Sequence, residues 1–297
     1  MKDKRVLFTS IDGFIGLNIF KNFNESNFFF LTDNIKRVNP KRRVYHYTDF
    51  EKILKLKKIN IVFNNRGILL GTNSKLNKIN NLDSRKIFNI TTRYSIDYFI
   101  NLDTNKALVS PGLPSSIIGH GKGMDYHSSK KSFRNFFMNS KSNFFRVNLY
   151  CDIIYGPNDK LHKFVNKTVF EILNNDKNIS LYNPNLKRNF LYIDDFIKYI
   201  NRLLNSTDKI NNNYSEFFFS SGELNTLECF IDTIKDILDS DIYIKIYRGN
   251  LYRKTNNIMK NEFNSTRNPK WIRLGKTVGL KKGLKKVIKP FLDGSSK

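Results

Sequence analysis

Tyr126 and Lys130 are the residues whose types and spacing point most directly to chemistry. Side chains four residues apart on a helix lie on one face, one turn from each other. An ammonium that close stabilises phenolate, so it lowers the pKa of the tyrosine hydroxyl and lets it donate and accept protons near neutral pH. The same spacing also arises by chance on surface helices. The pair therefore indicates catalysis only if the rest of the chain supplies the parts it needs.

A glycine turn early in the chain supplies a candidate cofactor site. Gly13 and Gly16 lie between the first apolar strand and the first helical pattern. Glycines in such a turn let the backbone approach a pyrophosphate, which then rests on the free N–H groups of the helix N-terminus. We therefore predict that the segment Gly13-Phe14-Ile15-Gly16 binds a dinucleotide. Ser10 stands where the G-x-x-G-x-x-G form of the turn has its first glycine.

Asp33 follows the second apolar run and bears on the choice of dinucleotide. A carboxylate at this place binds both hydroxyls of an adenosine ribose and repels a 2′-phosphate. Lys36 and Arg37 follow closely, and their charges would instead attract a 2′-phosphate. The segment therefore predicts NAD or NADP as the cofactor, with Asp33 favouring NAD, while a simple turn residue is the competing interpretation.

The elements that position these residues alternate along the first half of the chain. Strands are expected at 5–9, 27–32 and 60–63, with helices at 14–23 and 49–58 between them. Strand and helix in alternation are typical of an α/β protein with a Rossmann-type, doubly wound parallel sheet.

The rest of the chain separates into two parts. Further strands are expected at 107–110 and 147–154, and the helix that carries Tyr126 at 126–139. After about Tyr155 the pattern changes, and later helices are expected at 164–173, 194–204, 227–238 and 280–291. We predict a dinucleotide-binding domain at 1–155 and a smaller, mainly substrate-binding region at 156–297, from which the chain crosses back to the first domain.

Composition narrows the class of partner. Lys and Arg total 51 against 26 acidic residues, for a net charge of +25. Nucleic-acid binding is one interpretation; a general bias toward Lys, Asn, Ile and Phe is the one we favour, because the basic residues form no long tail or stripe. A positive field also favours an anionic substrate such as a nucleotide diphosphate.

The sequence also bears on location and metals. No apolar run approaches the ~20 residues of a membrane span, and the N-terminus does not have the layout of a secretory signal. Cys151 and Cys229 match no metal spacing and make no disulfide framework. We therefore expect a soluble, cytoplasmic protein with no metal site and no membrane partner.

Several segments, in order, resemble the extended short-chain dehydrogenase/reductase family. The resemblance lies in VLFTSIDGFIG, YHSSKKSF, IIYGPND, KRNFLYIDDFIKYI, FSSGELNTL and the closing NPKWIRLG and LKKGLKKVI. Members of this family are mostly epimerases, dehydratases and 4-keto-reductases of nucleotide-activated sugars. The resemblance thus implies an NAD(P)-dependent enzyme of nucleotide-sugar metabolism, and we expect a role in making surface-polysaccharide sugars.

The resemblance also implies roles for single residues. Tyr126 would exchange a proton with the substrate hydroxyl or ketone, and Lys130 would hold the nicotinamide ribose. Arg188 matches the family arginine that contacts the nucleotide diphosphate, since a guanidinium fork suits phosphate oxygens. Asn89 resembles the family's helix asparagine. Family members commonly form homodimers through the helix of the catalytic tyrosine and the helix before it, so we expect a homodimer here.

The hydroxyl residue that should bind the reacting oxygen is ambiguous. Ser110 ends the strand expected at 107–110 and lies 21 residues after Asn89. Thr104 is the rival, but it leaves only 15 residues after Asn89, which is cramped. We therefore favour Ser110 slightly. Neither residue is followed by the acid pair typical of dehydratases, so epimerase and 4-keto-reductase are the preferred activities.

Some departures from the family pattern support a second hypothesis. Ser10 replaces a glycine, and Asn64-Asn65-Arg66-Gly67 replaces the usual small residues after the third expected strand. A dinucleotide-binding protein that keeps the fold but is catalytically impaired is therefore the alternative, and a basic nucleic-acid binder is a remote one.

Overall fold

The computed structural model describes residues 4–38, 43–104, 126–175, 179–182, 184–247 and 268–294. The chain divides into two compact units. The first contains residues 1–150 and 200–217, and the second contains residues 151–199 and 218–297. Each unit is described by itself.

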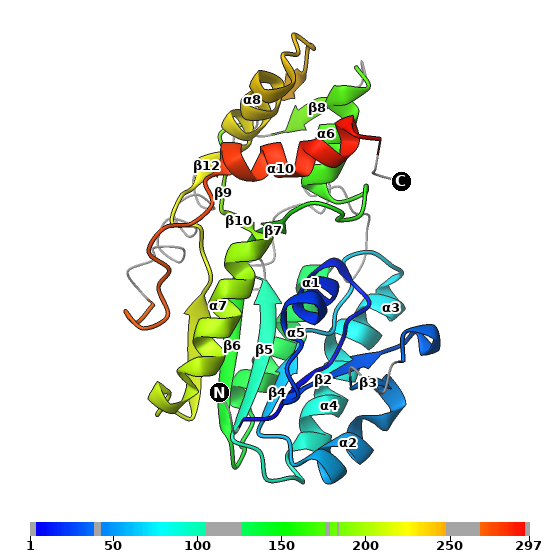
Figure 1. The fold of residues 1–297 in the computed structure, drawn as a ribbon, viewed down its shortest axis with the longest axis vertical. Helices are drawn as coiled ribbons and strands as arrows, with labels where there is room; N and C mark the ends of the chain where they lie inside the picture. The colour runs from blue at the N-terminus through cyan, green and yellow to red at the C-terminus, as the bar shows by residue number, and fades with distance from the viewer. Residues whose placement is uncertain are drawn as a thin grey trace. The chain divides into compact units, whose positions relative to one another are not determined.

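The first unit is built on a seven-stranded sheet. Its strands lie in the order β11 (Tyr214–Phe218), β6 (Phe145–Cys151), β5 (Tyr98–Thr104), β4 (Ile61–Asn64), β1 (Val6–Phe8), β2 (Phe28–Thr32) and β3 (Val44–His46) (Figure 1). The pairs from β3 to β5 are all parallel. After β1 the chain adds β2 and β3 on one side of it and then β4, β5 and β6 on the other. The strand order therefore reverses between β1 and β4. This is a Rossmann-type, doubly wound sheet, as the sequence predicted, and ligands of such sheets bind at that reversal.

Side-chain alternation explains how both faces of the sheet are covered. Leu7 points to a core that also receives Val62 and Phe99 from neighbouring strands. Helices α2 (Phe50–Lys57), α4 (Ser84–Thr91) and α5 (Tyr126–Asn139) cover this face. Phe8 points the other way, where its ring stacks on Phe30 with centroids 5.6 Å apart and where α1 (Phe14–Asn22) packs. A parallel strand buried on both faces must be apolar throughout, and β1 is.

Shorter elements complete the first unit. The turns η1 (Ile35–Arg37) and η3 (Tyr47–Asp49) follow β2 and β3. Before α4 the chain forms one short helix, α3 (Asn73–Asn77), and then a π-helical segment, η4 (Lys78–Asp83), which runs directly into α4. Such π-helical turns are rare and are frequent at functional sites. The turn η7 (Thr207–Lys209) precedes β11.

The second unit consists of helices and three small sheets. Its strand pairs are β7 (Ile153–Tyr155) with β10 (Phe190–Tyr192), β9 (Lys187–Arg188) with β12 (Asn225–Thr226), and β8 (Ser180–Tyr182) with β13 (Lys245–Tyr247). Its helices are α6 (Phe164–Leu173), α8 (Leu227–Leu238) and α10 (Leu280–Leu292), while α7 (Ile193–Asn205) begins here and ends in the first unit. Helix α10 packs against α8 and α6, so the basic C-terminal helix covers its own unit.

Two strand predictions need comment. The strand expected at 147–154 is wrong as a single element, because the chain leaves β6 at Asp152 and starts β7 at Ile153 in another sheet. The buried Asp152 carboxylate accepts a hydrogen bond from the Asn189 backbone N–H at 3.0 Å, which fixes the break. The strand expected at 107–110 lies outside the described residues, and the strand next to β4 is β5.

Candidate functional site

The glycine turn lies at the reversal of strand order, between β1 and α1. Gly16 is buried, and a Cβ there would lie 2.7 Å from the Cα of Ile11, so the helix approaches the turn as closely as glycine allows. Gly13 caps α1, is exposed, and has nothing within 4 Å of where a Cβ would be. Free N–H groups of the first helical turn therefore open onto unfilled space, which suits a pyrophosphate.

Ser10, the residue in place of the first glycine, is braced by Asn65. The Asn65 side chain donates to the Ser10 carbonyl at 2.6 Å and accepts from the Ser10 N–H at 3.0 Å. The Asn65 N–H in turn donates to the Thr9 hydroxyl at 3.1 Å. The two departures from the family pattern are thus bonded to each other. The sequence did not reveal this, because the two residues are 55 positions apart.

Asp12 and Asp33 shape the end of β2. The Asp12 carboxylate accepts from the Thr32 hydroxyl at 2.5 Å and from the Asp33 N–H at 2.9 Å, so it ties the glycine turn to β2. Asp33, predicted to bind an adenosine ribose, pairs with Arg66 at 2.7 Å while its side chain stays 53% exposed. Arg66 therefore holds the Asp33 carboxylate in place, and the exposed part of that carboxylate remains accessible to a ligand.

Arg66 is a buried residue of this region that sequence reasoning did not assign. Its guanidinium also contacts Asp83 at 3.2 Å and lies 3.9 Å from the centre of the Tyr47 ring. Burial lowers the pKa of Arg66, but the hydrogen bond to Asp33 and the surrounding negative charges more than reverse this effect. Burial also raises the pKa of Tyr47 to about 12, so the ring under the guanidinium is a neutral phenol. Arg66 consequently places a fixed positive charge beside Asp33.

The predicted catalytic pair begins α5. Tyr126 is the first residue of the helix, and Lys130, one turn further, is only 6% exposed. The Lys130 ammonium donates to the Leu102 carbonyl of β5 at 3.2 Å. Burial lowers the pKa of Lys130, and the charge of Asp103 partly opposes that shift. A buried ammonium within one turn of a phenol is the arrangement that lowers a tyrosine pKa.

The asparagine that lies beside Lys130 is Asn80. Asn89, which resembles the family's helix asparagine in sequence, does not lie there. Asn89 is exposed on α4, whereas Asn80 is fully buried in the π-helical segment η4. Asn80 donates to the Ser129 hydroxyl at 3.0 Å, and its Oδ1 lies 3.2 Å from the Cβ position of Gly67, where the Lys130 ammonium lies at 3.3 Å. The signal in the sequence was the run of asparagines, but nothing there distinguishes a π-helical turn from an ordinary one.

Of the two candidate hydroxyl residues, Thr104 and Ser110, only Thr104 lies among the described residues. Thr104 ends β5, is 6% exposed, and its N–H donates to Asp103 at 2.8 Å. Ser110 lies outside the described residues. The spacing argument against Thr104 is wrong, because α4 ends at Thr91 and β5 starts at Tyr98, which leaves room for the turn between them.

A chain of amide side chains crosses the sheet beneath these residues. The Thr9 hydroxyl donates to Asn64 at 3.1 Å, Asn64 donates to Asn101 at 2.9 Å, and Asn101 donates to Asn148 at 2.7 Å. These residues come from β4, β5 and β6 and from the residue after β1. Buried polar groups need such partners, so the carboxyl end of the sheet is a preorganised polar layer.

Arg188, the predicted diphosphate contact, lies in the second unit. It belongs to β9, where it pairs with Asn225 of β12, and its guanidinium lies 3.7 Å from the Asp152 carboxylate. Its side chain is 11% exposed and that of Asp152 is fully buried. The strand pair therefore fixes the backbone of Arg188, and the buried carboxylate lies close enough to attract its guanidinium.

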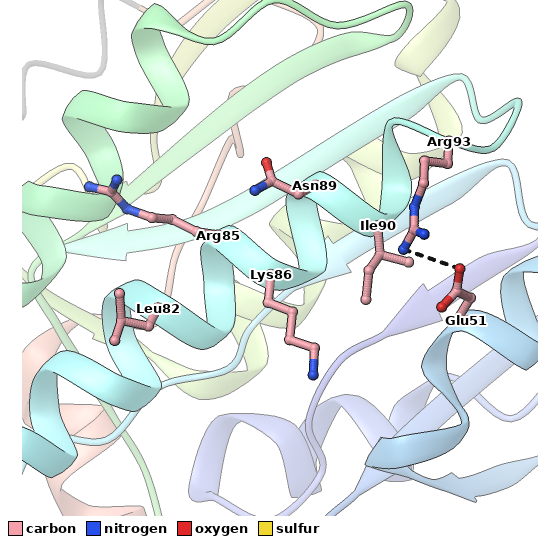
Figure 2. A pocket seen from close by; sticks show the side chains of 7 residues that line it. All are labelled: Glu51, Leu82, Arg85, Lys86, Asn89, Ile90 and Arg93. Carbon is pink, nitrogen blue, oxygen red and sulfur yellow. Dashed lines mark ion pairs between the residues drawn. The ribbon is translucent and has the colours of Figure 1, made fainter.

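The first unit also has a surface hollow of about 570 Å³ over α4, shown in Figure 2. It is lined by Glu51, Leu82, Arg85, Lys86, Asn89, Ile90 and Arg93. Arg93 pairs with Glu51 at 3.1 Å, and Arg85 lies 4.6 Å from the centre of the Phe136 ring. Three cations face one carboxylate here, so the hollow is basic.

The described parts of the chain hold no group of three or more His, Cys, Asp or Glu side chains placed to bind a metal. Within those same parts, no helix has the length and apolar character that crossing a bilayer requires.

Of the comparisons with known proteins, the one with solved structures identifies the fold. No protein-family profile matches the sequence, and no curated protein matches it either. Among solved structures, a UDP-glucuronic acid 4-epimerase from Bacillus cereus, in complex with UDP-glucuronic acid and NAD, is 14% identical with a TM-score of 0.71, over 97% of this chain and 99% of that one.

Two further structures show the same likeness. A UDP-glucose 4-epimerase from Thermotoga maritima with UDP-glucose is 18% identical with a TM-score of 0.70, over 98% of this chain and 99% of that one. RMD from Pseudomonas aeruginosa with NADPH is 13% identical with a TM-score of 0.68, again over 98% and 99%. The chain thus has, over nearly its whole length, the fold of these three proteins, as its resemblance to the extended short-chain dehydrogenase/reductase family predicted.

Proposed function

We propose that this protein is an NAD(P)-dependent enzyme that acts on a nucleotide-activated sugar, as a 4-epimerase or a 4-keto-reductase. One observation carries the proposal: the buried Lys130, with Tyr126 one turn before it, lies on the helix beside the carboxyl end of the same sheet whose reversal point holds the glycine turn. The solved structures of the same fold support it, because they contain UDP-sugars, NAD or NADPH.

The chain's own residues suit a dinucleotide. The open N-terminus of α1 at Gly13 would hold the pyrophosphate, and the exposed carboxylate of Asp33 would accept the adenosine ribose hydroxyls. Lys130 would donate to the nicotinamide ribose. When bound, the nicotinamide supplies or accepts a hydride. NAD is the preferred cofactor in this proposal, because Asp33 disfavours a 2′-phosphate, although Arg66 weakens that preference.

Tyr126 performs the proton chemistry. As phenolate it takes the proton of a substrate hydroxyl, and as phenol it gives that proton back to a ketone. The charge of Lys130 stabilises the phenolate, which brings the pKa of Tyr126 toward neutrality. Ser110, favoured from the sequence, and Thr104 are the two candidates for the hydroxyl that binds the reacting oxygen. The spacing argument that favoured Ser110 no longer holds, so Ser110→Ala and Thr104→Val, compared in turnover, decide between them.

Arg188 would bind the diphosphate of the substrate. Its support is the buried Asp152 carboxylate 3.7 Å from the guanidinium, together with the net charge of +25 that attracts anions. A nucleotide sugar made in the cytoplasm for surface polysaccharides fits this chemistry, and it is the role we propose.

We also propose a homodimer formed through η4, α4 and α5. Phe133 and Phe137 on α5 do not contribute to this interface, because both are buried in the core. Leu82, which is 51% exposed, and the partly buried Phe136 supply the remaining apolar surface. A twofold axis brings the same surface patch of the two protomers together. The basic hollow of Figure 2 would therefore face the basic hollow of the second protomer.

The test is a coupled assay with purified protein. NADH or NADPH is incubated with a panel of nucleotide-linked 4-keto sugars, and NAD with nucleotide sugars, while absorbance and product stereochemistry are followed. Turnover of at least one substrate is expected, and Tyr126→Phe should remove it while leaving NADH affinity unchanged. Absence of turnover with intact cofactor binding would instead favour the catalytically impaired alternative. Steeply salt-dependent binding to nucleic acid would favour the remote one.

A further inference from the structure

We propose that Asp103 is a positioning residue for Lys130: a buried carboxylate that keeps the lysine ammonium charged and so sets the pH range in which Tyr126 can work. The proposal rests on the proposed function for what Tyr126 does. The interaction between Asp103 and Lys130, however, can be measured without any substrate.

The first support is placement. Side chains alternate along a strand, so Phe99, Asn101 and Asp103 of β5 all point to the face that α4 and α5 cover. Phe99 confirms the direction, because its ring lies 5.4 Å from that of Phe137 on α5. Asp103 is the last of the three, beside Leu102, whose carbonyl accepts from the Lys130 ammonium. Asp103 is 5% exposed and Lys130 is 6% exposed, so both charges are shielded from water.

The second support is that the surroundings of Asp103 suit a carboxylate. The Asn148 Oδ1 accepts a hydrogen bond from Asn101. The NH₂ group of Asn148 therefore faces the other way and donates to Asp103 at 3.1 Å. The other carboxylate oxygen accepts from the Thr104 N–H at 2.8 Å. The donor chain that starts at Thr9 therefore runs in one direction across the sheet and ends on Asp103. An ionised carboxylate only accepts hydrogen bonds. Both contacts to the Asp103 carboxyl come from donors, so this environment suits its ionised form.

The third support is electrostatic. Burial raises the pKa of Asp103, and the charge of Lys130 is the largest influence that opposes this rise. Burial lowers the pKa of Lys130, and the charge of Asp103 is what opposes that fall. Each group thus stabilises the ionised form of the other. A buried charge whose partner has been removed is strongly disfavoured, so without Asp103 the lysine would lose its proton at a lower pH.

The consequence reaches Tyr126 through the lysine. A neutral amine at Lys130 would no longer stabilise phenolate, so the pKa of Tyr126 would rise as that of Lys130 falls. In the direction that needs phenolate, the acidic limb of the pH–rate profile depends on Tyr126 and the alkaline limb on Lys130. Loss of Asp103 should therefore narrow the profile from both sides.

A double-mutant cycle in urea unfolding tests the interaction itself. Asp103→Asn and Lys130→Met are made singly and together, and the equilibrium constants for unfolding are compared at pH 8. We expect a coupling of at least tenfold. Asp103→Asn removes the negative charge that supports the buried Lys130, and Lys130→Met leaves Asp103 with only the weaker influence of Arg134. The matched control pairs Lys130→Met with Asp97→Asn, an exposed carboxylate just before the other end of β5, and it should show no coupling. A coupling below twofold for Asp103 would overturn the proposal.

The pH–rate profile then tests the functional half. In Asp103→Asn we expect the alkaline limb to move down by about one pH unit or more, with NADH affinity at neutral pH changed less than turnover. Asp103→Glu keeps the charge and should keep the wild-type profile even if it lowers stability, and Asp97→Asn should match wild type. A profile that does not move, despite a measured coupling, would overturn the role through Tyr126. If the wild-type protein has no turnover while the coupling is present, the proposed function has failed and the electrostatic interaction between Asp103 and Lys130 stands.

Discussion

Replacing Gly16 by alanine tests the close approach of α1 to the strand before it. The added Cβ would lie 2.7 Å from the Cα of Ile11, and both atoms belong to elements that pack against the core, so the helix has to move. Overpacking costs about 1–3 kcal/mol, and the upper part of that range, about 2–3 kcal/mol, applies here because the neighbouring atoms are backbone. Alanine gives back about 1 kcal/mol through its helix propensity. The expected net loss of stability is therefore about 1–2 kcal/mol.

Gly13 offers the matched control within the same turn. A Cβ there meets nothing within 4 Å, and the backbone angles, φ −105° and ψ 175°, are open to any residue. Gly13→Ala should consequently lower stability by only about 0.7 kcal/mol, the typical difference between these residues as helix caps. Its methyl group would instead occupy the space where a pyrophosphate meets the helix N-terminus, so NADH affinity should fall at least tenfold, about 1.4 kcal/mol.

The two variants are distinguished by two measurements. Urea unfolding followed by circular dichroism should shift its midpoint by about 0.5 M for Gly16→Ala, given a slope of about 3 kcal/mol per M, and by less for Gly13→Ala. Calorimetric titration with NADH should show the larger loss of affinity in Gly13→Ala. Equal stability of the two variants would refute the argument from close packing at Gly16. Unchanged NADH affinity in Gly13→Ala would refute the proposed pyrophosphate site.

Three further expectations follow from other contacts. Arg66→Met leaves Asp33 and Asp83 without their shared counter-charge, so the ratio of NADPH to NADH dissociation constants, measured by fluorescence titration, should rise at least fivefold; an unchanged ratio would separate Arg66 from cofactor choice. If the dimer forms over the basic hollow, sedimentation should show it strengthening with salt, since screening removes like-charge repulsion, and Leu82→Arg should weaken it. Gly283→Ala would place a Cβ 2.8 Å from Cζ of the buried Tyr155. Thermal unfolding should show a net loss of about 1–2 kcal/mol, which is an overpacking cost of about 2–3 kcal/mol less about 1 kcal/mol of helix propensity. The open Gly279→Ala, which only exchanges a helix cap, should lose about 0.7 kcal/mol.

The sequence was sufficient for the fold because each clue was local. Apolar runs of strand length, a glycine turn directly after the first strand, and a helix that presents Tyr126 and Lys130 on one face are all patterns between near neighbours. The strand at 147–154 failed for a related reason: its apolar residues are continuous, and only the tertiary contact of Asp152 with Asn189 shows where one sheet ends and another begins.

The parts of the site that sequence reasoning missed depend on distant contacts. Arg66 approaches Asp33 across 33 positions, and Asn80 approaches Ser129 across 49. Neither carries a local signal, since an arginine after a strand or an asparagine in a polar run is ordinary. Asp103 has the same character, because its partner Lys130 becomes its neighbour only when α5 packs on β5. Pair interactions of this kind set pKa values and cofactor preference, so they decide function beyond what motifs predict.

Asn65 gives the sharpest test of whether the altered glycine turn still binds a cofactor. Its side chain bonds both the N–H and the carbonyl of Ser10, so the turn is held through Ser10's backbone. Ser10→Gly should therefore leave NADH affinity nearly unchanged, because a glycine presents the same two backbone groups. Its effect on stability should be small, since it loses only the long 3.4 Å hydrogen bond that the Ser10 hydroxyl accepts from the Asp12 N–H. Asn65→Leu leaves both groups without that partner, and losing such bonds at partly buried sites costs about 1–3 kcal/mol.

The graded variant Asn65→Asp completes the argument. An aspartate still accepts from the Ser10 N–H but has no donor for the Ser10 carbonyl, so its stability, from urea unfolding, should lie between those of wild type and Asn65→Leu. NADH affinity should follow the same order, because the Ser10 backbone is what Gly16 and α1 pack against. If Ser10→Gly instead strengthened NADH binding tenfold or more, the serine itself would be impairing the site. Asn65 would then stabilise the fold of the turn without restoring its affinity for the cofactor. In that case the catalytically impaired alternative would describe this chain better.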